Sequence, residues 1–221
     1  MLEKVETPPS LRDQVANKLR TSIVDGTLKP GTRLVERELC EQLGVSRPSV
    51  REAMRQLENE GLITNLPNRG PIVAVVSKKV AADVYEVRSA IEGLAARLFA
   101  RNASEEAIAE IKQCCQELLD MPKKASPLEY LALKDRFYSI LLNGSGNEML
   151  AHLGGMALRR FYQLRNLSVA KTNRAEESRK EIKKFVDALV ARDEEAAFKA
   201  CIEHIENTEK AVTRALEELN L

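Results

Sequence analysis

Apolar residues near the start of the chain recur at a helical interval. They occupy every fourth position, namely Leu11, Val15, Leu19 and Ile23. This spacing predicts a helix with one apolar side. The Pro-Pro-Ser triplet at 8–10 is a helix start signal, and Gly26 is where the helix should end, since glycine accepts the left-handed cap.

Two shorter helical patterns follow on either side of a tight turn. The first covers about 35–43 and ends at Gly44. Ser46 is expected to supply the N-cap oxygen of the next helix. That helix carries apolar residues at intervals of four and three, namely Val50, Met54 and Leu57. The segment therefore predicts a helix, a tight turn and a second helix.

The pattern then changes from β-prone to helical. Runs at 62–66 and 71–76 flank a Pro-Asn-Arg-Gly turn, which predicts a small hairpin, or wing. After about residue 79 the helical patterns lie near 80–101, 105–121, 127–143, 147–168, 174–191 and 194–218. The fold class expected is mainly α, with a winged helix-turn-helix domain at 8–77 and an all-α antiparallel six-helix bundle at 79–221.

Composition narrows the class of protein. Hydrophobic residues make up 44% of the chain and charged residues 30%, which excludes wholesale disorder. Aromatic residues make up only 4%, which disfavours an all-β fold. No apolar run approaches the roughly 18 to 20 residues that span a bilayer, so we expect a soluble, unsecreted, cytoplasmic protein with no membrane partner. The four cysteines lack zinc-ligand spacing and are expected to be reduced thiols.

Basic residues gather on one face of the third predicted helix. Arg47, Arg51 and Arg55 follow at intervals of four beside its apolar stripe. Guanidinium groups suit phosphate oxygens and guanine edges, and a helix fits the major groove. Ser46 and Ser49 can add hydrogen bonds at the same helix start. The alternative is a solvated face paired with nearby glutamates, but the turn before it and the wing after it favour DNA binding.

The residues of 31–70 resemble the GntR family of bacterial transcription regulators. The resemblance is carried by the segments at 34–39, 43–47 and 50–53 and by the closing Asn-Arg-Gly at 68–70. The remainder resembles the FCD effector domain of the FadR subfamily in its shorter, VanR-like form. Three segments carry this second resemblance, at 88–92, 144–147 and 188–193.

The first resemblance implies a set of DNA contacts. They fall on the second and third helices and the wing, at Arg37, Ser46, Arg47, Ser49, Arg51, Arg69 and Gly70. It also implies a homodimer that binds double-stranded DNA at a short palindromic operator. Repression is the family's usual mode, although activators occur.

The second resemblance raises the question of a metal. Many FCD domains hold a divalent ion with an Asp and three His side chains. Aligned on Phe137 and on 188–193, those positions fall at Lys134, Tyr138, Ile182 and His204. A lysine puts a cation where a cation would bind, and isoleucine has no lone pair. We therefore expect no metal and no cofactor.

The same cavity is expected to hold a small organic anion directly. The side chains predicted to line it are polar or cationic, namely Arg88, Lys134, Tyr138, Asn147, Arg159 (or Arg160) and His204. Two of these have simpler alternatives. Arg88 could form a helix pair with Glu92 four residues on, and His204 could be a hydrogen-bonded core residue.

Other functional classes remain as alternatives. The chain has no nucleophile elbow, phosphate loop or G-x-G-x-x-G motif, so we do not expect an enzyme. A metal-dependent regulator of the same fold is disfavoured by the lost ligands. A regulator whose cavity is filled by its own side chains would respond to a protein partner or to nothing.

Overall fold

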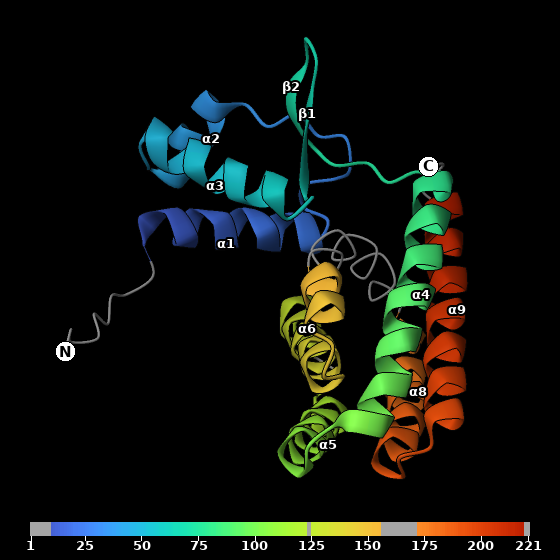
Figure 1. Ribbon diagram of the computed structural model, residues 1–221. Helices are drawn as coiled ribbons and strands as arrows, with labels where there is room; N and C mark the ends of the chain where they lie inside the picture. The colour runs from blue at the N-terminus through green and yellow to red at the C-terminus, as the bar shows by residue number, and fades with distance from the viewer. Residues whose placement is uncertain (1–9, 123–124, 156–171, 219–221) are drawn as a thin grey trace, which may run out of the picture. The chain divides into compact units, whose positions relative to one another are not determined.

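The computed structural model describes residues 10–122, 125–155 and 172–218. The chain forms two compact units, Met1–Val75 and Val76–Leu221. The first unit (Figure 1) consists of α1 (Leu11–Val24), α2 (Glu36–Leu43), α3 (Arg47–Asn59), β1 (Ile63–Leu66) and β2 (Gly70–Val73).

Local sequence accounts for the helices of the first unit. Ser10 caps α1 through a reciprocal capping box with Asp13. Gly44 ends α2 with a φ of 65°, a conformation in which a side chain would be strained. α1 and α2 both pack on α3, and the core between them is apolar, built from residues that include Leu19, Val50 and Leu57. Burial of these faces is what holds three short helices together.

The wing is a two-stranded antiparallel hairpin. Ile63 pairs with Val73 and Leu66 with Gly70, and the turn at 67–69 joins the strands. The second strand ends at Val73, so the predicted run to residue 76 was too long. The segment before α2 also joins the wing, because Arg33 forms an isolated bridge with Ile72. The sequence patterns did not predict this third pairing.

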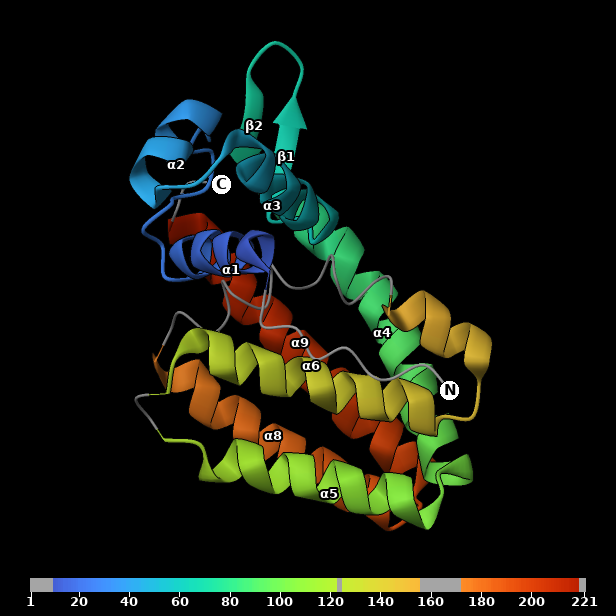
Figure 2. The same ribbon diagram turned by 90° about the vertical axis from the view of Figure 1, so that its left-hand side faces the viewer.

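The second unit is a helical bundle. It consists of α4 (Lys78–Asn102), α5 (Glu105–Asp120), α6 (Pro127–Gly144), α8 (Thr172–Val190) and α9 (Glu194–Glu218), and residues 148–155 are also helical. α4 packs on α9, α9 on α8, and α5 on both α6 and α8. Figure 2 shows α5, α6 and α8 side by side within this unit. The predicted helix near 147–168 continues into residues outside the described ranges.

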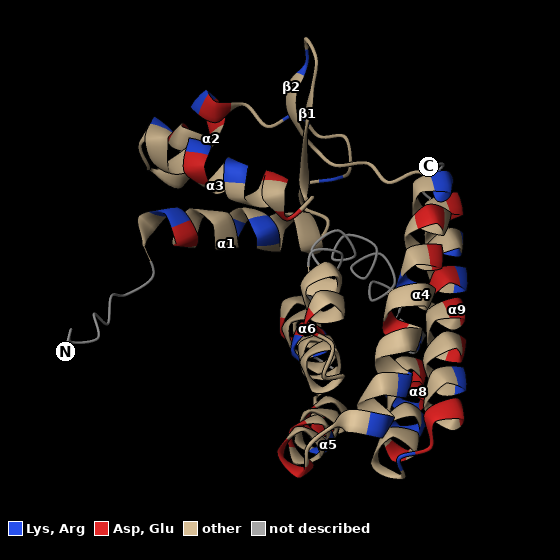
Figure 3. Ribbon diagram, in the orientation of Figure 1, with Lys and Arg blue, Asp and Glu red and all other residues tan. Residues whose placement is uncertain are grey.

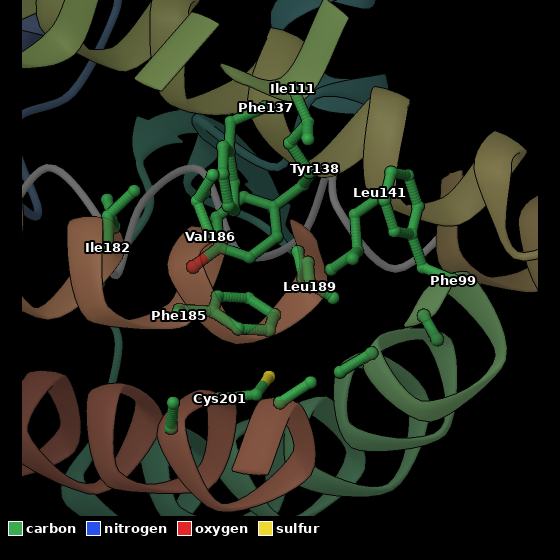
Figure 4. Packing of buried hydrophobic residues seen from close by; sticks show 14 of the residues in the cluster. Phe99, Ile111, Phe137, Tyr138, Leu141, Ile182, Phe185, Val186, Leu189 and Cys201 are labelled. Carbon is green, nitrogen blue, oxygen red and sulfur yellow. The ribbon is translucent and has the colours of Figure 1, made fainter. Parts of the chain in front are cut away.

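The core of the second unit is aromatic in its centre. Phe137 lies edge-on to Tyr138 of the same helix and to Phe185 of α8, with ring centroids 5.4 and 5.9 Å apart (Figure 4). Gly93 allows α4 to approach α9 closely. A Cβ there would lie 2.8 Å from the ring of Phe198, so even alanine would force the helices to shift.

Two further expectations concern membranes and thiols. In the described ranges, no helix combines the length and the apolar character needed to cross a bilayer. All four cysteines are free thiols, and Cys114, Cys115 and Cys201 are buried while Cys40 is partly exposed.

Candidate nucleic-acid interface and effector pocket

The arginine face of α3 is exposed in the structure. Arg51 and Arg55 keep 59% and 72% of their side chains exposed, and Arg47 at the helix start is also exposed. Arg51 Nε donates to both oxygens of Glu36 at 2.9 Å, and Arg55 pairs with Glu52. Figure 3 shows these cations along α3. Surface pairs of this kind are weak, so the guanidinium groups can exchange carboxylate for phosphate.

Ser46 lies at the N-cap position of α3 but does not cap it. Its side chain accepts no backbone hydrogen bond, and its Oγ lies 3.0 Å from the Oγ of Ser49. The prediction of an N-cap oxygen was therefore wrong. Two adjacent hydroxyls at a helix N-terminus, with the helix amides left unsatisfied by side chains, form a favourable environment for a phosphate.

The remaining predicted DNA contacts lie on α2 and the wing. Arg37 is 72% exposed and lies 3.8 Å from Glu41, one turn along α2. Arg69 is exposed in the turn of the wing. Gly70 follows it with a φ of 75°, which closes the turn after Asn68, itself at a positive φ of 62°.

Arg33 is a basic residue of this unit that sequence reasoning missed. It is exposed and bridges to Ile72 at the edge of the wing. The neighbouring amide of Leu34 donates to the carbonyl of Pro71 at 2.9 Å. The β-prone run Thr-Arg-Leu-Val at 32–35 was the available signal, but only a pairing distant in sequence brings it to the wing.

The second unit contains a small polar pocket. Four predicted residues, Arg88, Lys134, Tyr138 and His204, line it together. The lining is completed by residues of α6, α8 and α9, including Tyr130, Arg174, Ser178 and Thr208. Its volume is about 20 Å³, roughly what one water molecule needs.

His204 connects a cation to a carboxylate. Lys134 Nζ lies 3.0 Å from His204 Nε2, and His204 Nδ1 lies 2.5 Å from Glu181 Oε2. An ammonium group can only donate, so Nε2 accepts and the ring proton sits on Nδ1, where it is donated to Glu181. The imidazole is therefore neutral. Burial, together with the charge of Lys134, lowers the pKa of His204 to about 3.

Glu181 and Arg174 belong to the same network and were not predicted. Both Arg174 Nη atoms donate to Glu181, at 3.0 and 2.8 Å, and Nη2 also donates to Thr208 Oγ1 at 2.9 Å. Burial opposes the charge of Glu181, but hydrogen bonds from His204 and Arg174 lower its pKa to about 2. The signal was a polar continuation of the inward face of α8, where Arg174, Ser178 and Glu181 precede Phe185 at helical intervals.

Arg88 has both roles that its sequence context left open. Its Nε and Nη2 donate to Glu92 at 2.9 and 3.1 Å, and both side chains are only 1% exposed. Arg88 Nη2 also lies 3.4 Å from the hydroxyl of Tyr138. Arg88 is thus a buried ion-pair partner that also forms part of the pocket wall.

Three predicted positions do not join this pocket. Asn147 is exposed, and its Oδ1 accepts from the amide of Leu150 at 3.0 Å, so it caps the helix at 148–155. Arg159 and Arg160 lie outside the described residues. Ile182 is fully buried in the apolar core, while Arg174 and Ser178 are the polar residues of α8 that line the cavity.

The residues present do not fit a divalent metal. Lys134 already occupies the lone pair of His204 that a metal would need. Ile182 offers no donor. Among the described residues, no group of three or more His, Cys, Asp or Glu side chains is placed to hold a metal ion.

Comparison with known proteins decides the class. Residues 11–73 match the model for bacterial regulatory proteins of the gntR family, and residues 83–207 match that of the FCD domain. The chain belongs to the GntR family. As a GntR-family regulator it combines a DNA-binding domain with an FCD domain, the combination implied by its sequence motifs. The predicted mainly α fold with an N-terminal winged helix-turn-helix is confirmed.

Relatives of this GntR-family chain are named as transcriptional regulators. It is 28% identical over 216 residues to YdhC of Bacillus subtilis, an uncharacterized HTH-type regulator, over 97% of this chain and 96% of the relative. It is 30% identical over 155 residues to the Glc operon transcriptional activator of Escherichia coli, over 62% and 61% of the two chains. The solved structure of E. coli McbR/YncC has a TM-score of 0.72 at 25% identity, over 93% and 98% of the two chains.

Proposed function

We propose that this regulator is a cytoplasmic repressor that binds a short palindromic operator as a homodimer. The observation that carries the proposal is the exposed arginine face of α3, with Ser46 and Ser49 at its start and Arg69 on the wing. Guanidinium groups on a helix can contact base edges, while the hydroxyls and the wing contact the backbone. Repression needs only occupancy of the operator, whereas activation also needs a contact with the transcription machinery.

The DNA part of the proposal is tested with an operator selected from random-sequence duplexes. A palindromic consensus is expected, because two copies related by a two-fold axis read two equal half-sites. Arg47→Ala should weaken binding to this operator by about 1–3 kcal/mol. Arg12→Ala, at an exposed arginine of α1, is the matched control and should bind as wild type. Unchanged affinity of Arg47→Ala would contradict the proposed interface.

The direction of control is tested with a reporter. The selected operator is placed between a promoter and its reporter gene, and expression is measured with and without the protein. Repression predicts lower expression with the wild type and recovery with Arg47→Ala. Higher expression with the wild type would instead make the protein an activator, as the Glc operon relative is named.

The proposed effector is a small organic anion held without a metal. Lys134, Arg174 and Arg88 direct cationic groups at one pocket, and charge-assisted hydrogen bonds are the strong means of holding a carboxylate. An entering carboxylate would compete with Glu181 for Arg174 and thereby change how α8 is held against α9. A change in this unit that alters the spacing of two recognition helices would alter operator affinity.

The effector part is tested first by native mass spectrometry of the protein as purified. A dimer carrying an extra organic mass and no metal mass supports the proposal. Isothermal titration with acetate, lactate, succinate and citrate then measures affinity. Lys134→Met should weaken binding of the best acid at least tenfold, and Lys183→Met, at an exposed lysine of α8, should not. Wild-type affinity of Lys134→Met would remove this lysine from the site.

A second candidate is a regulator that takes no small molecule. It is favoured by one observation, which is that Glu181 already supplies a carboxylate to Arg174 and His204 beside a cavity of about 20 Å³. In that case the native mass would equal the chain mass, no acid would bind, and operator affinity would not respond to any of them.

A further inference from the structure

The helix α4 has a second apolar face that points away from the bundle core. Val80, Val87 and Leu94 lie seven residues apart, and their side chains are 49%, 49% and 45% exposed. Three half-buried apolar residues lie between and after them, Val84, Ile91 and Leu98. These six residues form the outer stripe of α4, and the intervals between them alternate between four and three. This is the spacing of a helix that packs along another helix.

The outer stripe is separate from the face that α4 uses within the bundle. That inner face carries Ala81, Tyr85, Ala95 and Phe99, all nearly or fully buried. The seven-residue interval keeps the exposed members of the outer stripe on one line along the helix. A helix of 25 residues is about 37 Å long at 1.5 Å per residue. Contiguous exposed apolar surface of this extent marks an interaction site.

Charges beside the outer stripe identify the partner and its direction. Asp83, Ala90 and Arg97 form a parallel row, again seven residues apart, with Asp83 and Arg97 58% and 42% exposed. The row is negative at one end, small in the middle and positive at the other end. A second copy of α4 running in the opposite direction would place Asp83 near Arg97 at both ends. A parallel copy would place like charges together.

The existing pairs of these two residues leave the charges near the stripe. Asp83 accepts from Lys79 at 2.9 Å, and Arg97 pairs with Glu195 at 2.8 Å while its guanidinium stacks 4.0 Å above the ring of Phe198. Exposed pairs of this type contribute little. They orient the two side chains along the rim without preventing a further contact.

We propose that the outer stripe of α4 is the contact between two copies of this chain, with the two α4 helices antiparallel about a two-fold axis near Ala90. Val87 then packs beside Ile91 of the second copy, and Asp83 faces its Arg97. Such a contact is self-complementary, because each residue meets its mate twice. The inference uses no effector-pocket residue and names the surface that would make the proposed DNA-binding protein a dimer.

The first test measures the mass of the full chain in solution by sedimentation equilibrium over a dilution series. Val87→Glu puts a charge into the centre of the stripe and should raise the dimer dissociation constant at least a hundredfold. Met149→Glu, at a 67% exposed apolar residue of the same unit away from α4, is the matched control and should keep the wild-type value. Circular dichroism checks that both variants are folded.

The second test exchanges the charges. Asp83→Arg and Arg97→Asp should each weaken the dimer about three- to tenfold, and the double variant should restore most of the affinity, since each new pair is again opposite in sign. Coupling of this kind is specific to the antiparallel contact.

Three results would overturn the proposal. They are a monomeric wild type at the concentrations that bind the operator, a Val87→Glu variant with wild-type dimer affinity, and a double charge variant weaker than either single one. Loss of the dimer in Val87→Glu, with binding to a single half-site kept, would leave the DNA interface intact. The two proposals therefore fail separately.

Discussion

The two units of this protein use arginine in opposite ways. In the DNA-binding unit Arg51 keeps 59% of its side chain in solvent beside Glu36, whereas in the helical unit Arg88 and Glu92 are each 1% exposed. An exposed guanidinium can exchange partners at little cost. A buried one depends on its partner, because a charge left alone in the core is strongly unfavourable. The comparison suggests that arginine serves binding in the first unit and also architecture in the second.

Aromatic residues allow the two units to be observed separately. All four tyrosines and all five phenylalanines lie after residue 78, and the chain has no tryptophan. Tyrosine fluorescence therefore reports unfolding of the helical unit alone, and DNA titration reports the other unit. Each of the following predictions uses this separation.

The largest effect is expected from breaking the buried ion pair. Glu92→Gln removes the charge that compensates Arg88 and should lower the free energy of unfolding of the helical unit by about 3–5 kcal/mol. Urea unfolding followed by tyrosine fluorescence measures it. Glu194→Gln, which breaks the exposed pair with Arg101, is the control and should unfold at nearly the wild-type urea concentration. Equal effects of the two substitutions would contradict the contrast between the units.

The next effect is a dependence of stability on pH in the helical unit. His204 has a pKa of about 3 in the folded protein and about 6.5 when unfolded, so the unfolded state takes up a proton first as the pH falls. Stability is therefore full above about pH 6.5 and decreases below it by up to about 1.4 kcal/mol per pH unit. Below about pH 4.5 Glu181 adds a loss of the same sign, since its folded pKa is about 2.

The measurement is urea unfolding by tyrosine fluorescence between pH 7 and pH 5. His204→Gln should have a lower stability at pH 7 and a flatter pH dependence. His152 is the other histidine of the chain and is exposed, so His152→Gln should follow the wild-type curve. A wild-type slope in His204→Gln would mean that another group takes up the proton.

A smaller effect separates serines that cap helices from the serine that does not. Ser126 caps α6 through a capping box with Glu129, and Ser126→Ala should cost about 1 kcal/mol of unfolding free energy by tyrosine fluorescence. Ser46 makes no cap bond, so Ser46→Ala should leave the thermal transition by circular dichroism nearly unchanged and instead weaken operator binding. A stability loss in Ser46→Ala as large as that of Ser126→Ala would refute this assignment.

The smallest effect concerns the carboxylate beside the arginine face. Glu36→Gln removes the negative charge that holds Arg51 and should raise affinity for random-sequence DNA about two- to fivefold, since nonspecific binding is electrostatic. Glu41→Gln, beside Arg37 on α2, tests whether the effect is local to α3. The difference between the variants should shrink as salt is increased. Weaker binding of Glu36→Gln would mean that Glu36 positions Arg51 for DNA.

The sequence by itself determined the features that depend on near neighbours. Helix periodicity, the glycine end of α2 and the turn of the wing follow from local backbone preferences and from alternation of apolar positions. The arginine face of α3 follows from the 100° step of a helix. These features need no knowledge of what packs against them, and the structure has them where the patterns placed them, apart from the early end of β2.

Only the tertiary structure decided which polar residues meet. Ile182 and Glu181 are adjacent in the chain, yet one is in the apolar core and the other binds His204, because the packing of α8 against α6 and α9 sets the rotation of the helix. Arg33 joins the wing through a pairing distant in sequence. Ser46 has the sequence of a cap but bonds Ser49 instead. In each case several contacts are locally available, and the surrounding packing selects one of them.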